Sequence, residues 1–462
     1  MTNIHFQKTV LLTIKILTII LFVLAVARNF LNDNFVWIIN GGTYGDVYYQ
    51  NVDIAQSLLR WGLTLSIIVL PCAAFFKTRV LRNIAIYFCV PIAILCFVFY
   101  GRFLWYFTTP SGRAIMTAPW IRHVEFCLEL IIIIVVGLLF RFGVKHKFDI
   151  KNTREWVNFF CLTPLALLIV IPVYLPQSLF GFTNKYMAPL TIYNILWILV
   201  IFLLLAILYF VYRFKDKETR RMICTFLALF LFYHYNAIYL MDLKMSRLPF
   251  QLCNLGAYLI IVALLINKPK FFNFVLLANV PGTMIAFCVP DVSQGLLSFW
   301  NIHFYIEHTW VFVIPLLIVA LRVIERPKRN SLASFFIGFS IYFVFCAIVG
   351  VIANAYLYSE TSTFFDKVNY FYLFNNTVIQ VLSFLRYTRG FQITLNGYTF
   401  YPLYMLAIYV LYSAFCVAFY FLYNYFLKMG DSHFEYRQMR IELREKRGRY
   451  RNREVPKKYY DD

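Results

Sequence analysis

The sequence predicts an all-α membrane protein, a polytopic bundle of about 12 transmembrane helices with both termini cytoplasmic. Of its 462 residues, 61% are hydrophobic and only 14% are charged, whereas an ordinary soluble domain carries about 25% charged residues. The apolar residues form long runs, and the loops between the runs alternate in charge. A soluble fold would lack the polar residues needed to cover its surface, so the lipid bilayer must bury these runs.

Apolar runs of about 18 or more residues are long enough to cross the hydrocarbon core of a bilayer as helices. Twelve such runs occur, at 10–28, 54–76, 80–101, 121–141, 156–176, 190–212, 221–241, 250–267, 271–290, 300–321, 331–357 and 401–427. The first run resembles a signal peptide, but Lys15 interrupts it and Arg28 and Asn29 follow where a cleavage site would need small residues. We therefore interpret it as a transmembrane helix.

Basic residues gather in every second loop. They lie at Lys77, Arg79 and Arg82, within 141–154 and 213–221, at Lys268 and Lys270, and within 322–329. Loops rich in Lys and Arg remain on the cytoplasmic side of a membrane. Together with an even number of spans, this alternation predicts that both termini are cytoplasmic.

The topology predicts three regions. It also explains the net charge of +21, because most of the excess basic residues lie in the cytoplasmic loops and tail. Residues 1–215 hold six helices of unknown role, residues 216–427 hold six more, and residues 428–462 form a basic cytoplasmic tail. The tail is expected to attract anionic lipids of the inner leaflet. No RNA-binding or DNA-binding module fits in so short a segment, so we expect no nucleic-acid partner.

The ten cysteines lie in or beside apolar runs, and none forms a CxxC pair. This pattern predicts neither a disulfide framework nor a zinc site, and we expect no bound cofactor. Most of these cysteines are expected to pack as small apolar residues.

The first half contains two groups of candidate functional carboxylates, one inside a predicted span and one in an outer loop. Glu125 and Glu129 stand one turn apart on a predicted helix, and ionisable residues inside a span are usually functional because the bilayer penalises them. The first outer loop carries Asp33, Asp46 and Asp53, one of which would be the catalytic carboxylate of a glycosyltransferase that uses lipid-linked sugar.

Polar residues of the second half are predicted to lie within about 12 Å of the outer membrane boundary, near the ends of several helices. The candidate catalytic residues are Cys253, His308, His303, Glu307, Asp291 and Asn354. A thiol and an imidazole form the minimal nucleophile and base. The alternative is that the polar groups only hydrogen-bond between helices and that the cysteine only packs.

The runs SRLPFQLCNLGAYL, GTMIAFCVPD, FYIEHTWVFVIPL, VIANAY and NGYTFYPLYMLAIYVLYSAF follow one another between about 221 and 427. In this order they resemble the YwaF and TMEM164 family of integral membrane proteins. Animal members are described as cysteine-dependent acyltransferases that move a fatty acyl chain between phospholipids. The resemblance implies that Cys253 is the nucleophile and His308 the histidine, although Gln251 stands where bacterial members generally have histidine.

The leading hypothesis is a cell-membrane acyltransferase whose substrates are membrane phospholipids. In it, Cys253 attacks an acyl ester, and His308 takes the thiol proton and later activates a lysolipid hydroxyl. Glu307 or His303 would orient the neighbouring groups, and Asn354 or a backbone amide would stabilise the oxyanion.

Two other functions remain open on the sequence. A 12-helix secondary transporter would use Glu125, Glu129 and Glu307 for ion coupling. A glycosyltransferase would use Asp46 or Asp53.

Overall fold

The computed structural model describes residues 2–32, 35, 54–108, 117–144, 152–181, 183, 185–288, 290, 295–362 and 364–426. Four predicted site residues lie outside this part of the chain: Asp33, Asp46, Asp53 and Asp291. The basic tail also lies outside it. The chain divides into two compact units, Met1–Ile408 and Tyr409–Asp462, and the packing described below belongs to the first.

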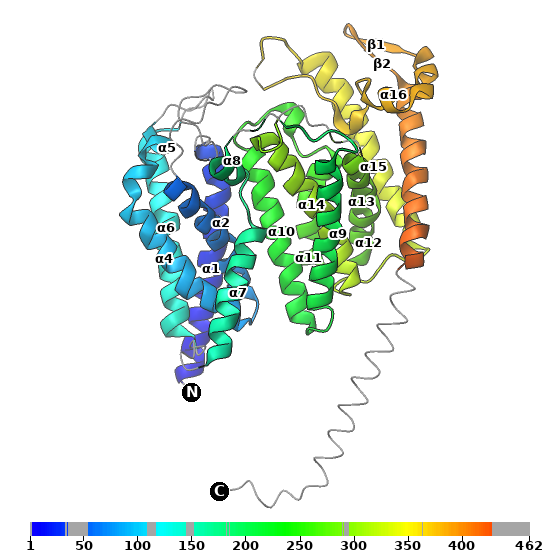
Figure 1. Ribbon diagram of the computed structural model, residues 1–462. Coiled ribbons are helices and arrows are strands. Elements are labelled where there is room, and N and C mark those ends of the chain that lie inside the picture. The colour runs from blue at the N-terminus through cyan, green and yellow to red at the C-terminus, as the bar shows by residue number, and fades with distance from the viewer. Residues whose placement is uncertain are drawn as a thin grey trace, which may run out of the picture. The chain divides into compact units, whose positions relative to one another are not determined.

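Helices dominate both halves of the described chain (Figure 1). The first half contains α1 (Thr2–Leu31), α2 (Ile54–Phe75), α3 (Arg79–Ile84), η2 (Ala85–Cys89), α4 (Val90–Val98), η3 (Tyr100–Phe103), α5 (Leu104–Thr108), α6 (Pro119–Gly143), α7 (Thr153–Ile169), α8 (Leu175–Phe180) and α9 (Ile192–Tyr212). The second half contains α10 (Lys217–Tyr239), η4 (Met245–Arg247), α11 (Leu252–Ile266), α12 (Pro269–Phe274), η5 (Val275–Asn279), α13 (Val280–Cys288), α14 (Phe299–Ala320), α15 (Ser331–Ile352), η6 (Ala353–Leu357), η7 (Tyr370–Tyr372), α16 (Thr377–Val381), η8 (Ser383–Gly390) and a last helix, Pro402–Phe426.

The strands in the described residues form a single short hairpin. Strand β1 (Ile393–Leu395) pairs antiparallel with β2 (Tyr398–Phe400). Asn396 and Gly397 join them with positive φ angles of 48° and 78°, which is the backbone conformation that a two-residue hairpin turn requires.

The helices confirm the predicted all-α, multi-pass membrane fold. Among the described residues, ten helices are long and apolar enough to cross a membrane. At two of the twelve predicted positions the helices are shorter: α7 has 17 residues and α11 has 15. Helix α7 ends at Ile169, shortly before Pro172, and α11 ends where Asn267 adopts a left-handed conformation. Both are helix-ending signals.

The two halves repeat one packing scheme. In the first, α1 packs against α2 and α6, α4 packs against α6, and α3 packs against α7. In the second, α10 packs against α11 and α14, α13 packs against α14, and α12 packs against α15. Figure 1 shows α10 beside α11 and α14. The first unit therefore contains two similarly packed groups of helices.

A shared irregularity supports this repeat. The π-helical turn η2 precedes Val90 and Pro91, and η5 likewise precedes Val280 and Pro281. Proline has no backbone N–H to complete the α-helical ladder, and a π turn accommodates such a local disruption. A buried asparagine lies eight residues before each proline, namely Asn83 and Asn273.

Helix α10 lies at the junction of the halves, where it contacts α1 and α2 as well as α11 and α14. Asp216 caps its N-terminus: the Thr219 hydroxyl and backbone N–H donate to the two carboxylate oxygens at 2.7 and 2.9 Å. The hydrogen bond from the Thr219 hydroxyl contributes most, followed by the one from its backbone N–H, and together they hold the pKa of Asp216 below its ordinary value. The cap fixes the beginning of the helix that carries the polar residues described next.

Candidate functional site

The segment that leads into α11 is anchored on both sides. The Tyr342 hydroxyl donates to the Phe250 carbonyl at 2.8 Å. The Gln251 amide donates to the Asn369 carbonyl at 2.8 Å and accepts from the Phe371 backbone N–H at 3.0 Å. Gln251 therefore uses both ends of its amide to hold this segment against the chain around residue 370.

Cys253 is the second residue of α11 and is partly buried. Its thiol donates to Asn254 Oδ1 at 3.3 Å. Glu307 on α14 and Tyr239 on α10 are electrostatic neighbours of the thiol. The N-terminal end of a helix stabilises negative charge, whereas burial and the charge of Glu307 oppose a free thiolate at Cys253.

His303 on α14 joins the polar side chains of two helices. Its Nδ1 lies 3.1 Å from Nε2 of His234. On the other side of the ring, Nε2 lies 3.0 Å from the Tyr239 hydroxyl and 3.1 Å from Glu307 Oε2. His303, His234 and Glu307 are all at least 95% buried, so these contacts form inside the protein rather than on its surface.

His308 has a different arrangement. Its Nδ1 donates to the Phe304 carbonyl at 2.8 Å, and its ring packs on the Phe304 ring with centroids 4.1 Å apart. A neutral imidazole that donates from Nδ1 carries its lone pair on Nε2. His308 can therefore accept a proton at Nε2.

Glu307 brings together three of the candidates predicted from sequence. It is a neighbour of the Cys253 thiol, a hydrogen-bonding partner of His303 and an electrostatic neighbour of His308. Within the described part of the chain, the thiol hydrogen-bonds to Asn254 and to neither imidazole. The charge of Glu307 therefore acts on the thiol and on both imidazoles.

Asn354 lies in η6, after α15, and binds the chain that follows. Its amide donates to the Val368 carbonyl at 2.9 Å and to the Tyr398 hydroxyl at 3.2 Å, and it accepts from the Val368 backbone N–H at 2.9 Å. Both amide N–H groups are therefore engaged, and Asn354 joins the end of α15 to the segment that also holds Gln251.

Sequence reasoning did not select His234 and Tyr239 on α10. Both belong to the run YHYNAIYL, in which polar and aromatic residues interrupt an apolar span. The concentration of polar residues was the available signal, since the bilayer disfavours each of them. Their contact with His303 depends on how α10 packs against α14.

The predicted carboxylate pair of the first half forms a separate polar cluster. The Arg28 guanidinium on α1 forms an ion pair with Glu129 on α6 and donates to the Tyr233 hydroxyl at 2.9 Å. Glu125 lies beside Glu129. In the sequence, Arg28 indicates only that the first run is not a cleaved signal peptide. In the structure it is the buried counter-ion of Glu129.

Close packing of α11 gives a testable prediction. A Cβ on Gly256 would lie 2.1 Å from Asn279 Nδ2 and 3.2 Å from Val311 Cγ1. Gly256→Ala is expected to destabilise the protein by about 1–3 kcal/mol, because α11 or Asn279 must move. Thermal unfolding of the purified protein measures the effect. Gly101→Ala is the control, since no atom lies within 4 Å of its added Cβ, and equal loss in both variants would contradict the prediction.

Long apolar helices with a partly buried thiol, a buried carboxylate and buried imidazoles define a multi-pass membrane protein with a candidate site for covalent chemistry. The model of the TMEM164 family matches residues 179–423, more than half of the chain. The chain belongs to this family. The match confirms the predicted resemblance and begins upstream of it, so that it includes α9. No curated protein and no solved structure matches the chain.

Proposed function

We propose that this protein transfers a fatty acyl chain between membrane phospholipids through Cys253. The supporting observation is that Glu307 is a neighbour of both the Cys253 thiol and the two imidazoles of α14. A thiol with bases close to it can carry an acyl group as a thioester. The resemblance to cysteine-dependent animal members of the family supports the same chemistry.

The first half-reaction forms the thioester. Cys253 Sγ attacks the ester carbonyl of a phospholipid, and the thiol proton passes through Glu307 to His303. The proton then moves to the departing glycerol oxygen, which leaves as the hydroxyl of a lysophospholipid. Backbone N–H groups in the first turn of α11 have no partner within the helix and are suited to stabilise the oxyanion. We assign that role to them because the N–H groups of Asn354 are engaged elsewhere.

The second half-reaction transfers the chain to an acceptor. His308 Nε2 takes the proton of a lysolipid hydroxyl, whose oxygen attacks the thioester carbonyl. A new ester forms, the carbon–sulfur bond breaks, and the proton returns to the Cys253 sulfur. His308 suits this step because its Nδ1 is engaged with the Phe304 carbonyl, which leaves Nε2 as the acceptor.

The test uses purified protein in lipid nanodiscs that contain a phospholipid with a labelled acyl chain. Transfer of label to an added lysophospholipid is expected. Without the acceptor, label is expected on the protein as a thioester that hydroxylamine cleaves. Absence of both products over a range of headgroups and chain lengths would remove the proposal.

The two imidazoles are expected to affect different half-reactions. His308→Ala should slow transfer to the acceptor by about a hundredfold, the scale of general base catalysis, while the thioester accumulates. His303→Ala should instead slow formation of the thioester. Rapid-quench measurement of labelled protein and labelled product separates the two steps. Equal effects of both variants on both steps would contradict these assignments.

A second candidate function is secondary transport. Repeated groups of helices are a common architecture of transporters, and the buried Arg28, Glu125 and Glu129 are groups that ion-coupled transporters use. Substrate-dependent proton flux into vesicles, lost in Glu129→Gln, would favour it over acyl transfer. The glycosyltransferase hypothesis remains a prediction, because its carboxylates Asp46 and Asp53 lie outside the described residues.

Attraction of the tail, residues 428–462, to anionic lipids is likewise a prediction. We propose the cytoplasmic leaflet as its site of contact and the cell membrane as the location of the protein. Both follow from the distribution of basic residues in the sequence.

A further inference from the structure

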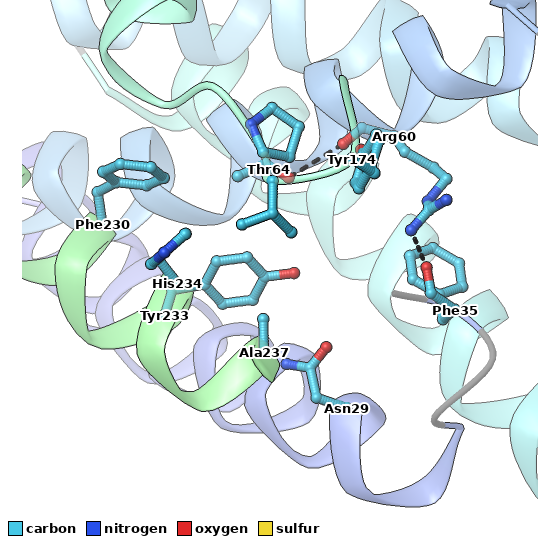
Figure 2. A pocket seen from close by; sticks show the side chains of 11 residues that line it. Asn29, Phe35, Arg60, Thr64, Tyr174, Phe230, Tyr233, His234 and Ala237 are labelled. Atoms are coloured by element: carbon cyan, nitrogen blue, oxygen red, sulfur yellow. Dashed lines mark hydrogen bonds between the residues drawn. The ribbon is translucent and has the colours of Figure 1, made fainter. Parts of the chain in front are cut away.

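A small cavity lies between the two halves, where α1, α2, α10 and the segment before α8 meet (Figure 2). Its volume is about 30 Å³, and its wall includes Asn29, Arg60, Thr64, Tyr233 and His234. A cavity of this size with several polar groups on its wall can hold one or two water molecules. Water in this cavity could therefore hydrogen-bond to a polar side chain that would otherwise be buried without a partner.

His234 belongs both to this cavity and to the Cys253 site. Figure 2 shows its ring on α10, next to Tyr233. Its Nε2 lies 3.1 Å from His303 Nδ1, and the two rings stack with centroids 5.2 Å apart. The imidazole pair thus extends from Glu307 to the cavity wall.

The pair can hold one additional proton with all its N–H groups satisfied. Two neutral imidazoles carry two N–H groups, and a singly protonated pair carries three. One N–H can donate from His303 Nε2 to Glu307 Oε2, one lies between the rings, and water in the cavity can accept the third from His234. Without such acceptors, a buried imidazolium would be strongly disfavoured.

Charged groups approach the pair from several elements. These groups and other titratable neighbours are Glu307 and His308 on α14, Tyr233 and Tyr239 on α10, Arg28 on α1, Arg60 on α2, Glu129 on α6, Tyr174 before α8, and Arg247 with its partner Asp242 after α10. Arg28 and Arg247 are each paired with a carboxylate. Glu307 contacts the pair directly at 3.1 Å and would compensate an additional proton, whereas burial and the charge of Arg247 oppose a proton on His303.

We propose that His234 is a positioning residue of the Cys253 site, sharing with His303 the proton that leaves the thiol while cavity water accepts its outer N–H. The inference rests on the acyl-transfer function proposed above. The S–H bond of Cys253 breaks, Glu307 relays the proton and remains ionised, and an N–H bond forms on the imidazole pair. The helices of the first half then contribute to the chemistry by enclosing the water that hydrates His234.

The test measures alkylation of Cys253 by N-ethylmaleimide at a series of pH values, with mass spectrometry to locate the modified cysteine. In His234→Phe, alkylation at neutral pH is expected to be about tenfold slower, the scale of losing a group that orients an imidazole. The pH profile should also move to higher pH, because His303 would then have to hold the thiol proton without its partner. His234→Gln should restore much of the rate, since its amide can bind His303 Nδ1, but not the pH profile, because an amide does not take up the proton. His123→Phe is the control: this histidine bonds Tyr100 at 2.6 Å, away from the site.

Each result decides the proposal. An unchanged rate and profile in His234→Phe would overturn it, and so would a His234→Gln variant as impaired as His234→Phe, because packing alone would then explain the loss. Alkylation needs no lipid substrate. The expected shift in a protein without acyl transfer would therefore uphold the positioning role and reject the proposed function. Acyl transfer in a protein whose alkylation profile does not shift in His234→Phe would uphold the proposed function and reject the positioning role of His234.

Discussion

A Cys253→Ser variant is expected to lose acyl transfer by about a thousandfold or more, the scale on which enzymes lose activity with their nucleophile. A serine hydroxyl is a far weaker nucleophile than a thiol near neutral pH, and among the described residues position 253 hydrogen-bonds to Asn254 rather than to an imidazole that would activate serine. The rate of label transfer to the lysophospholipid measures the effect. Labelled thioester on the protein should disappear in parallel.

The matched control for this prediction is Cys288→Ser. Cys288 is the last residue of α13 and is exposed, so its replacement should leave transfer and thioester formation unchanged. A Cys253→Ser protein that unfolds at the wild-type temperature but transfers acyl chains at the wild-type rate would refute a catalytic role for this thiol.

Breaking the ion pair between Arg28 and Glu129 is expected to cost about 3–5 kcal/mol of stability. The two side chains are 1% and 0% exposed, and removing either partner leaves the other as an uncompensated buried charge. Thermal unfolding of purified Arg28→Met and Glu129→Leu variants should show a large loss for each. Combining both substitutions should recover much of it, because the double variant buries neither charge.

An exposed ion pair provides the comparison. Lys328 lies 3.8 Å from Glu325, and their side chains are 80% and 74% exposed. Lys328→Met should therefore cost about 1 kcal/mol or less. Additive losses in the double variant of Arg28 and Glu129 would contradict the assignment of a coupled buried pair.

Composition and periodicity predicted the membrane fold well. The apolar runs correspond to the long helices because lipid burial and backbone hydrogen bonding impose the same length on every span. The limits of α7 and α11 were less accurate, since local signals at Pro172 and Asn267 shorten them. The repeat had a signal in the sequence, the equal spacing from Asn83 to Pro91 and from Asn273 to Pro281, which becomes meaningful once the π turns are seen.

The candidate site was predicted in part. The order of the motifs selected Cys253, His303, Glu307 and His308, because polar residues are few in a chain with 14% charged residues. Asn354 was selected for the same reason, yet its amide binds Val368 and Tyr398. A polar residue in a span signals that it needs partners, but its sequence position does not identify them.

The sequence by itself determined that the chain lies in a membrane and which family it resembles. These properties follow from hydropathy and from residue order, which are local along the chain. Tertiary structure decided that the charge of Glu307 acts on the Cys253 thiol, that Arg28 pairs with Glu129, and that His234 joins the cavity to His303. These contacts depend on the rotation of each helix and on its neighbours, and side chains about 70 to 100 positions apart meet only when the helices pack.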